Sequence, residues 1–257
     1  MVKKLEHSGS RIQRKSATGG ADHEGIHNTI LLGLPRKECE LIFSKIEFLQ
    51  LPTHTVLNDM NEPIKHAYFM NSGLASILNV MSDGKTVEVG LCGKEGFVGL
   101  PLIVGFERSP TQAIIQIEGS AFRVKARYLI EALKKCPRLE KSLHRYAQEL
   151  ALQVTQVAAC NRMHEVDNRL ARWLLMSEDR VGSSVFQLTQ EFIAHMLGTR
   201  RASVTIAAGI LQKAGLITYK RGQVKIKDRA GLEDAACECY GSQNQQLANW
   251  RKDLRAN

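Results

Sequence analysis

Residues 188–214 constrain this chain most, because their pattern predicts two short helices joined by a tight turn. Thr189 can cap the first helix by accepting an unpaired backbone N–H. Gly198 follows the last turn of that helix, where glycine tolerates the left-handed backbone, and a second helix begins near Arg200. The apolar residues that recur at helical spacing are Phe192, Ile193, Met196, Leu197, Val204, Ala207, Ala208 and Leu211. This pattern predicts a helix-turn-helix whose second helix enters the major groove of DNA; a helical hairpin with solvated arginines is the alternative.

A predicted β-hairpin follows the two helices directly. Residues 215–219 read as a turn into a short strand, Arg221 and Gly222 as a turn, and residues 223–227 as a return strand with alternating side chains. The basic residues of this hairpin, which suit contact with phosphates, are Lys220, Arg221, Lys225, Lys227 and Arg229. A hairpin at this place predicts a winged helix, whereas a solvated charged hairpin is the alternative.

The chain as a whole is basic, with a formal net charge of +9 over 257 residues. A basic chain is attracted to polyanions such as DNA, although RNA or a membrane surface would also fit. No apolar run approaches the roughly 20 residues of a membrane span, and the N-terminal segment lacks the apolar core of a signal peptide. We therefore expect a cytoplasmic protein with no membrane partner. Reduced thiols fit that compartment, and the six cysteines are Cys39, Cys92, Cys136, Cys160, Cys237 and Cys239.

The first half of the chain divides into a tail and a predicted sensor domain. Residues 1–27 are polar, basic and aperiodic, which predicts a flexible tail. In residues 28–136 short strand patterns alternate with turns, and Asp83-Gly84 between two of them is a strong hairpin signal. This pattern predicts a small β-barrel or a sandwich, and a small β-barrel can hold one ligand. Glycines at every third position fit tight turns better than a phosphate-binding loop; they are Gly90, Gly93, Gly96 and Gly99.

A long helix is predicted from about Pro137 to Met163, within a dimerisation segment that covers residues 137–164. Residues at a spacing of seven form two series, of which the first is Leu143, Leu150 and Val157 and the second is Ala147, Val154 and Asn161. Together they predict a coiled-coil seam between two copies of the chain; a helix packed on its own barrel is the alternative. The residues assigned to the dimer interface are Leu143, Leu150, Val154, Val157 and Asn161.

The helical periodicity resets near residues 164–168, which we interpret as the hinge between two domains. Asp167 is a candidate cap for the next helix. The predicted DNA-binding domain covers residues 165–240 and ends in a helix over residues 230–240, and residues 241–257 read as a polar C-terminal tail. The predicted fold class is therefore α+β, with an N-terminal β-barrel, a long helix and a C-terminal winged helix-turn-helix.

This order of parts resembles the CRP/FNR family of bacterial transcription regulators, over about residues 28–240. The segments that carry the resemblance are YFMNSG (68–73), GKEGFVGLP (93–101), NRLA (168–171), LTQE (188–191), LGTRRASV (197–204) and CECY (237–240). The last of these is similar to a signature of alphaproteobacterial members. The resemblance implies that the barrel is a jelly roll of the cyclic-nucleotide-binding type.

The resemblance also implies a homodimer on a palindromic site in double-stranded DNA, with RNA polymerase as a further partner. By position, Arg201 can bind O6 and N7 of a guanine, whereas Thr199 and Arg200 are placed for phosphates. Ala202 and Ile206 replace residues that better-known members carry, so the half-site should differ from theirs. The residues assigned to DNA binding are Thr189, Thr199, Arg200, Arg201, Ser203, Thr205 and Lys225.

The predicted effector is not cyclic AMP, and no cofactor is assigned. Members that bind cyclic nucleotides carry Glu where this chain has Phe97, and an apolar ring cannot accept the hydrogen bond of a ribose hydroxyl. Arg108-Ser109 resembles the pair that grips the cyclic phosphate, and Thr155 is placed where the long helix could reach a base. The residues assigned to the effector pocket are Gly96, Phe97, Arg108, Ser109 and Thr155. A cyclic-nucleotide-binding module that acts through protein partners is the alternative function.

The sequence predicts neither an enzyme nor a metal site. We identify no GxSxG motif, paired carboxylates or Cys/His arrangement that indicates catalysis. No cysteine precedes Cys39, so the N-terminal cysteine cluster of some family members is missing, and Cys237-x-Cys239 is closer than the usual metal-binding pair. Cys160 could be a reactive thiol, although a buried inert cysteine is the simpler interpretation.

Overall fold

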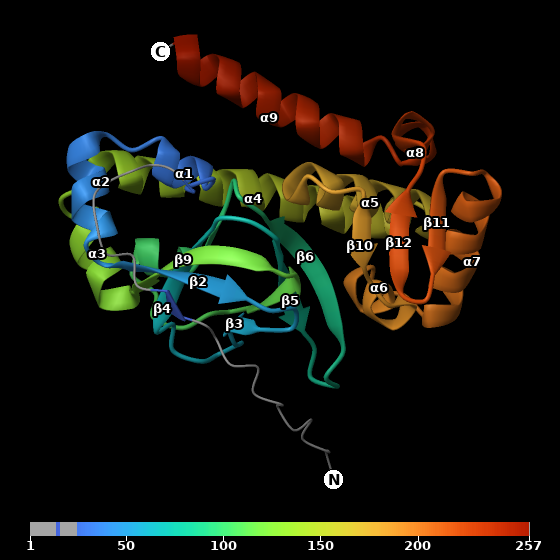
Figure 1. Cartoon of the computed structure of the whole chain (residues 1–257), viewed down its shortest axis with the longest axis horizontal. Helices are drawn as coiled ribbons and strands as arrows, with labels where there is room; N and C mark the ends of the chain where they lie inside the picture. The colour runs from blue at the N-terminus through green and yellow to red at the C-terminus, as the bar shows by residue number, and fades with distance from the viewer. Residues whose placement is uncertain (1–13, 16–24, 257) are drawn as a thin grey trace.

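The computed structural model describes residues 14–15 and 25–256. Figure 1 shows a β-rich part and a helical part, joined by one long helix. The expected flexible tail, residues 1–27, falls mainly outside the described residues. Within the described part of the chain, every helix is too short or too polar to span a bilayer.

Two antiparallel sheets form the N-terminal domain. The first sheet has the strand order β1 (Arg14–Lys15), β2 (Ile46–Leu51), β9 (Gly119–Lys125), β4 (His66–Met70) and β7 (Phe97–Val98). The second has the order β3 (Val56–Asn58), β8 (Gln112–Ile117), β5 (Leu74–Val80) and β6 (Thr86–Cys92). Over the described residues the two sheets are separate rather than closed into one barrel, so the expected barrel has the double-sheet form of a jelly roll.

Apolar side chains from both sheets share one core. Leu49 of β2, Phe69 of β4 and Ile115 of β8 are buried and belong to the same hydrophobic cluster. Because each sheet contributes to that cluster, the sheets pack face to face. The predicted hairpin at Asp83-Gly84 is confirmed, since it joins β5 to β6 and Gly84 has a φ of 82°.

Short helices close one end of this domain and position the start of the long helix. They are α1 (Thr29–Leu32), α2 (Arg36–Phe43), the 3₁₀ helix η1 (Leu100–Val104) and α3 (Ala126–Leu133). The Glu38 carboxylate of α2 accepts the backbone N–H groups of Arg138 (3.1 Å) and Leu139 (2.9 Å). These N–H groups would otherwise lack partners at the start of the long helix, so Glu38 caps it from a distant part of the sequence.

The long helix α4 spans Pro137–Met163, as the sequence predicts. It lies along β6, where the Gln153 side chain accepts the N–H of Leu91 and donates to its carbonyl oxygen. Both contacts are buried, so this face of α4 belongs to the core of its own chain.

Part of the predicted dimer interface is wrong for this reason. Leu143 is 0% exposed and Val157 is 8% exposed within the single chain, and Leu150 lies against Gly90 of β6. A spacing of seven identifies one face of a helix but does not show whether that face packs against its own chain or against a second copy. Val154, which is 37% exposed, and the half-buried Asn161 remain accessible.

The C-terminal part begins with α5 (Val166–Val181), which follows the predicted hinge directly. The cap of this helix is Glu165 rather than Asp167, which lies in its first turn. The remaining elements of the winged helix are β10 (Val185–Gln187), α6 (Gln190–Met196), α7 (Arg201–Lys213), β11 (Ile217–Lys220) and β12 (Gln223–Ile226). Strand β12 pairs with both β10 and β11, so the wing is three-stranded, whereas the sequence predicts only two strands.

The C-terminus is more helical than expected. Instead of one helix over residues 230–240 there are two, α8 (Arg229–Ala235) and α9 (Cys239–Ala256), separated by an extended Ala236. Residues 241–256, expected to be a polar tail, therefore form most of α9. Figure 1 shows α9 running back over α4, which it contacts.

Candidate nucleic-acid interface

The turn between α6 and α7 has the contacts that a helix-turn-helix requires. The Thr189 hydroxyl accepts the Phe192 N–H at 3.2 Å, which confirms the predicted cap. Gly198 has a φ of 58°, in the left-handed region, and the Thr199 N–H donates to the Ala194 carbonyl at 2.9 Å. These bonds satisfy the end of α6 and set the direction in which α7 leaves it.

Helix α7 has one buried face and one exposed face. Its buried residues, all predicted, are Val204, Ala207, Ala208 and Leu211. Arg200, Arg201 and Thr205 are exposed, and Ser203 is half-buried. Most of the residues assigned to base and phosphate contact thus gather at the N-terminal end of α7, where Arg200, Arg201 and Thr205 face solvent.

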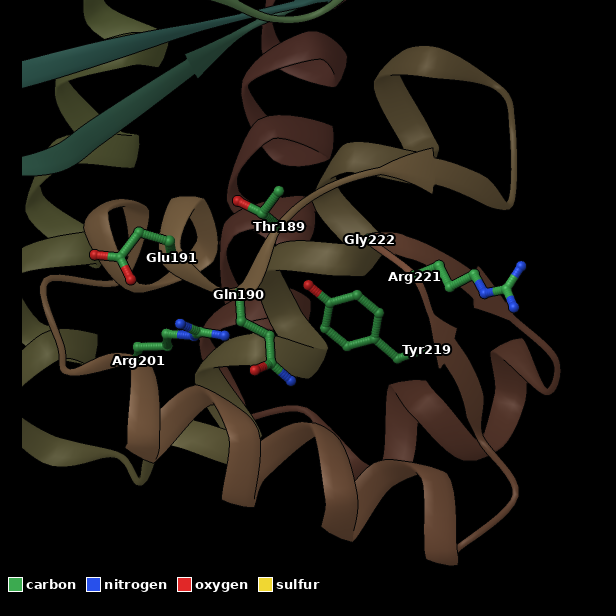
Figure 2. Close-up of a pocket in the computed structure, with 7 residues that line it drawn as sticks. All are labelled: Thr189, Gln190, Glu191, Arg201, Tyr219, Arg221 and Gly222. Carbon is green, nitrogen blue, oxygen red and sulfur yellow. The ribbon is translucent and has the colours of Figure 1, made fainter.

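A hollow of about 490 Å³ separates this end of α7 from α6 and the wing. Its lining residues are Thr189, Gln190, Glu191, Arg201, Tyr219, Arg221 and Gly222. Figure 2 shows the Arg201 side chain extending toward Gln190, whereas Arg221 extends away from the other labelled side chains. The Tyr219 hydroxyl donates to the Leu188 carbonyl at 2.6 Å, and burial raises the pKa of Tyr219 to about 12. Tyr219 is therefore a neutral, fixed wall of the hollow.

Three residues of this surface are not among the predicted site residues. The Thr205 hydroxyl donates to the Gln190 side chain at 2.8 Å, so Gln190 orients it. Ile206 is 66% exposed and Ile210 is 49% exposed on the outer face of α7. The helical period gives a signal for both isoleucines, because they fall off the buried face. No local signal indicates Gln190, because its contact joins two helices.

The exposed cations near the N-terminal end of α7 lack the salt bridges that Arg229 makes. Over the described residues, the salt bridges do not include Arg200, Arg201 or Lys225. Arg229 was expected to be part of the basic wing, but its guanidinium pairs with three carboxylates, those of Glu178 (2.7 Å), Asp179 (2.7 Å) and Glu233 (2.9 Å). Arg229 thus links α8 to the end of α5, unlike the unpaired cations of the wing, and its expected contact with phosphate stays a prediction.

The opposite side of the winged helix packs against the second sheet through a buried polar group. The Glu88 carboxylate of β6 accepts hydrogen bonds from Trp173 of α5 (2.9 Å) and from Ser76 of β5 (2.6 Å). Burial raises the pKa of Glu88 to about 7, against the lowering effect of these two bonds and of the charges of Arg172 and Arg180. A protonated Glu88 can donate to the Ser76 hydroxyl, which also bonds Gln116.

Further contacts hold the two domains together at this junction. Arg180 of α5 pairs with Glu95 at 2.8 Å, and both side chains are largely buried. The turn glycine Gly198 lies against Val87 of β6, and the rings of His54 and Phe192 are 5.7 Å apart. The N-terminal domain therefore contacts α5 and α6 and leaves the N-terminal end of α7 free.

The residues assigned to the effector pocket have separate environments. Phe97 is buried and its ring lies 4.8 Å from that of Phe69. The exposed Arg108 donates to the Asn61 carbonyl at 2.7 Å. The Ser109 hydroxyl donates to the Thr111 carbonyl, and Thr155 of α4 donates to Ala151. At Gly96 a side chain would collide with Cys92 and Tyr146, so this glycine serves close packing against α4.

Two short matches to catalytic motifs lack the structure that their chemistry needs. HEGIH at 23–27 fits HExxH, but its described residues, 25–27, are not helical, and a metalloprotease needs both histidines on one helix face. GKT at 84–86 lies in and after the hairpin turn between β5 and β6, not in a phosphate-binding loop before a helix. Neither match indicates an enzyme.

Two family models match the chain in the order of its two domains. A cyclic nucleotide-binding domain matches residues 48–136, and a Crp-like helix-turn-helix domain matches residues 168–235. The chain belongs to the CRP/FNR family of transcription regulators. It is thus a DNA-binding regulator rather than an enzyme, and its β-rich domain is of the cyclic-nucleotide-binding type.

Solved CRP/FNR structures have the same fold. FixK2 from Bradyrhizobium japonicum is 17% identical, with 75% of this chain and 98% of that one covered at a TM-score of 0.64. The c-di-GMP responsive regulator CLP from Xanthomonas campestris is 17% identical, with 75% and 99% covered and a TM-score of 0.63. A CRP/FNR-family regulator from Thermus thermophilus is 21% identical, with 74% and 98% covered and a TM-score of 0.60. A search of curated proteins found no match.

One group of side chains in the described part of this CRP/FNR chain can hold a metal ion. It consists of Cys160, His164, Cys237 and Cys239, whose ligand atoms all lie within 4.8 Å of one another. The group lies where the end of α4 meets α8 and α9, away from both the DNA-reading end and the effector domain.

Proposed function

We propose that two copies of this chain form a cytoplasmic homodimer that binds a palindromic site and regulates transcription with RNA polymerase. The observation that carries the proposal is the exposed N-terminal end of α7, whose arginines have no salt-bridge partner among the described residues. A helix-turn-helix dimer presents two such helices about one turn of duplex apart, which matches the symmetry of the protein to that of the site.

Each side chain of this surface has a chemical role in the proposal. Arg201 binds O6 and N7 of a guanine, since it is long enough to leave the hollow and its fork matches both atoms. Ile206 contacts a thymine methyl group, because an apolar side chain that is 66% exposed gains from burial in the groove. Ser203 and Thr205 contact base edges or adjacent phosphates. The residues assigned to phosphates are Thr189, Thr199, Arg200 and Lys225.

The dimer seam in this proposal lies on the outer face of α4. The accessible residues along that face follow a spacing of four and three, as a coiled coil requires; they are Ala147, Ala151, Val154, Ala158 and Asn161. Most are small, so two helices can approach closely. This seam keeps Val154 and Asn161 from the predicted interface. It leaves Leu143 and Val157 buried in their own chain and the half-buried Leu150 against Gly90 of β6.

The effector in this proposal is not cyclic AMP. Phe97 occupies the position that would accept the ribose hydroxyl, and its ring packs against Phe69. Arg108 and Ser109 already bond to backbone carbonyls. The fold permits other ligands, as the name of the c-di-GMP responsive relative indicates. Isothermal calorimetry with cyclic AMP and cyclic GMP tests this: no heat is expected, and micromolar binding of either would contradict the proposal.

A mobility-shift assay on the DNA upstream of its own gene tests the proposed function. The wild type should shift that DNA in the presence of excess competitor, whereas Arg201→Ala should lose this preference. Arg127→Ala is the matched control, because Arg127 is an exposed arginine of α3 whose side chain bonds to the neighbouring Tyr128, away from the winged helix. No shift by the wild type at any salt concentration would contradict DNA binding and favour a module that acts through protein partners.

A further inference from the structure

Three cysteines and a histidine that are far apart in the sequence meet at the hinge. Cys160 and His164 lie at the end of α4, Cys237 lies between α8 and α9, and Cys239 begins α9. The Cys160 and Cys237 sulfur atoms are 3.4 Å apart, and the Cys239 sulfur is 3.6 Å from Nδ1 of His164. All three thiols are buried and form a small cluster of their own.

These distances fit four ligands of a single ion. With Zn–S bonds of about 2.3 Å and Zn–N bonds of about 2.0 Å, the ligand atoms of a tetrahedral site lie roughly 3.5 to 3.8 Å apart. The distances of 3.4 Å between the Cys160 and Cys237 sulfur atoms and 3.6 Å between the Cys239 sulfur and Nδ1 of His164 agree with this edge length, and all four ligand atoms lie within 4.8 Å of one another. A cluster of several irons would hold its ligands further apart, because each ligand binds a different iron.

The histidine has the outer partner that metal-binding histidines usually have. Nδ1 of His164 faces Cys239, and the other ring nitrogen, Nε2, lies 3.1 Å from the Glu238 carboxylate. A carboxylate in this position fixes the ring so that Nδ1 offers its lone pair to the metal. A histidine without this role would not need one nitrogen directed at a thiol and the other at an acid.

Positive charge near the three cysteines also fits a bound zinc ion. Three thiolates and Zn²⁺ carry a net charge of −1, which is costly to bury without nearby positive charge. Two buried arginines of α5, Arg169 and Arg172, interact electrostatically with Cys160. Neither takes part in a salt bridge with a carboxylate over the residues that the structure describes.

We propose that Cys160, His164, Cys237 and Cys239 bind one Zn²⁺ ion with tetrahedral Cys₃His coordination. The sequence predicts no metal site because the spacing of Cys237-x-Cys239 is too short for a metal-binding pair by itself; the other two ligands come from α4, about 75 residues earlier. The ion joins the end of the long helix to the start of α9 across the hinge. It therefore fixes the start of α9, which follows the winged helix directly, to the end of the long helix.

Metal content of the untagged full-length chain tests the proposal. Protein made in medium with zinc should contain one zinc per chain, and Cys239→Ser and His164→Ala should each lose most of it. Cys136→Ser is the matched control, since Cys136 is a buried thiol outside the group. Wild-type protein that contains no zinc, or a zinc content that Cys239→Ser leaves unchanged, would overturn the proposal.

Cobalt provides a readout that does not depend on how well a variant folds. Wild-type apoprotein titrated with Co²⁺ should develop thiolate-to-cobalt charge-transfer absorption and the visible bands of a tetrahedral site, and Zn²⁺ should displace both. Bands typical of six oxygen or nitrogen ligands, or no bands, would overturn the assignment.

The outer carboxylate and the proposed link each have a separate test. Glu238→Gln should lower the zinc affinity about 10- to 100-fold while the site still fills at saturating zinc, because the outer partner only orients His164. Glu140→Gln, which changes an exposed acid at the other end of α4, should leave the zinc affinity unchanged.

Hydrogen exchange tests the proposed link between α4 and α9. Removal of zinc by a chelator should speed hydrogen exchange in α9 and leave exchange in the two sheets unchanged. Equal exchange in α9 with and without zinc would overturn the link.

Discussion

Charged groups at the two ends of the winged helix have opposite environments: exposed and unpaired at one end, buried and paired at the other. At the DNA-reading end, Arg200, Arg201 and Lys225 are exposed and take part in none of the salt bridges between described residues. At the end that packs on the second sheet, Glu88 accepts two hydrogen bonds and Arg180 pairs with Glu95.

This difference separates stability from recognition within one small domain. Exposed unpaired cations contribute little to folding but are available to release counterions when they meet phosphates. Buried paired groups cost much to remove, because a lost partner leaves a polar atom without compensation. Substitutions at the reading end should therefore change DNA binding at constant stability, and substitutions at the packed end should change stability first.

Trp173→Ala should have the largest effect on stability, a loss of about 3–5 kcal/mol in the free energy of unfolding. The side chain is 1% exposed, so its removal leaves a cavity, and Glu88 loses a hydrogen-bond donor. Urea denaturation followed by circular dichroism measures the loss. Trp173→Phe keeps most of the packing and should cost less; equal losses for both would mean that packing contributes little here.

Stability should also depend on pH through Glu88. Its pKa rises from an ordinary 4.5 to about 7 in the folded chain, so between these values the folded state holds a proton that the unfolded state has lost. The free energy of unfolding should therefore fall as pH rises from 4.5 to 7, by up to about 1.4 kcal/mol per pH unit, and level off above 7. Denaturation curves across this range, compared with Glu88→Gln, isolate the effect. An unchanged slope in the variant would assign the pH dependence to other groups.

Arg201→Ala should cost about 1–3 kcal/mol in binding free energy and relax the preference at one base position. The free energy of unfolding should stay within about 0.5 kcal/mol of the wild type, because the side chain is exposed. Fluorescence anisotropy with a set of singly altered duplexes measures both the loss and its position. An equal loss on all duplexes would make Arg201 a phosphate contact instead.

Lys225→Ala should have the smallest effect. Since the wing is proposed to contact phosphate, binding should weaken on all sequences alike, and the slope of log K against log salt should fall by about one. Lys213→Ala is a suitable comparison, because Lys213 is an exposed lysine at the far end of α7. A change in sequence preference for Lys225→Ala would place this lysine against a base.

Features set by neighbouring residues could be predicted from the sequence. The bounds of α4, the Thr189 cap, the turn at Gly198 and the Asp83-Gly84 hairpin all follow from local periodicity and backbone preference. These signals depend only on residues a few positions apart, so they can be read without knowledge of the tertiary structure.

Features that depend on distant contacts could not be predicted. The seven-residue spacing on α4 does not reveal that Leu143 packs into the core of its own chain. Nothing in the sequence near Arg229 indicates that it pairs with three carboxylates. The link between Thr205 and Gln190 joins two helices, and the grouping of Cys160 with Cys237 spans the hinge. In each case the fold brings together residues that the sequence separates.

Selection of binding sites from random duplexes tests the central claim most directly. Full-length protein at fixed salt should enrich an inverted repeat whose half-sites are centred about one turn, roughly 10 base pairs, apart, since two α7 helices enter successive major grooves on one face. Arg201→Ala should enrich the same repeat with one position relaxed in each half. Enrichment of a single asymmetric site, or of no sequence at all, would contradict a dimer that reads DNA with paired α7 helices.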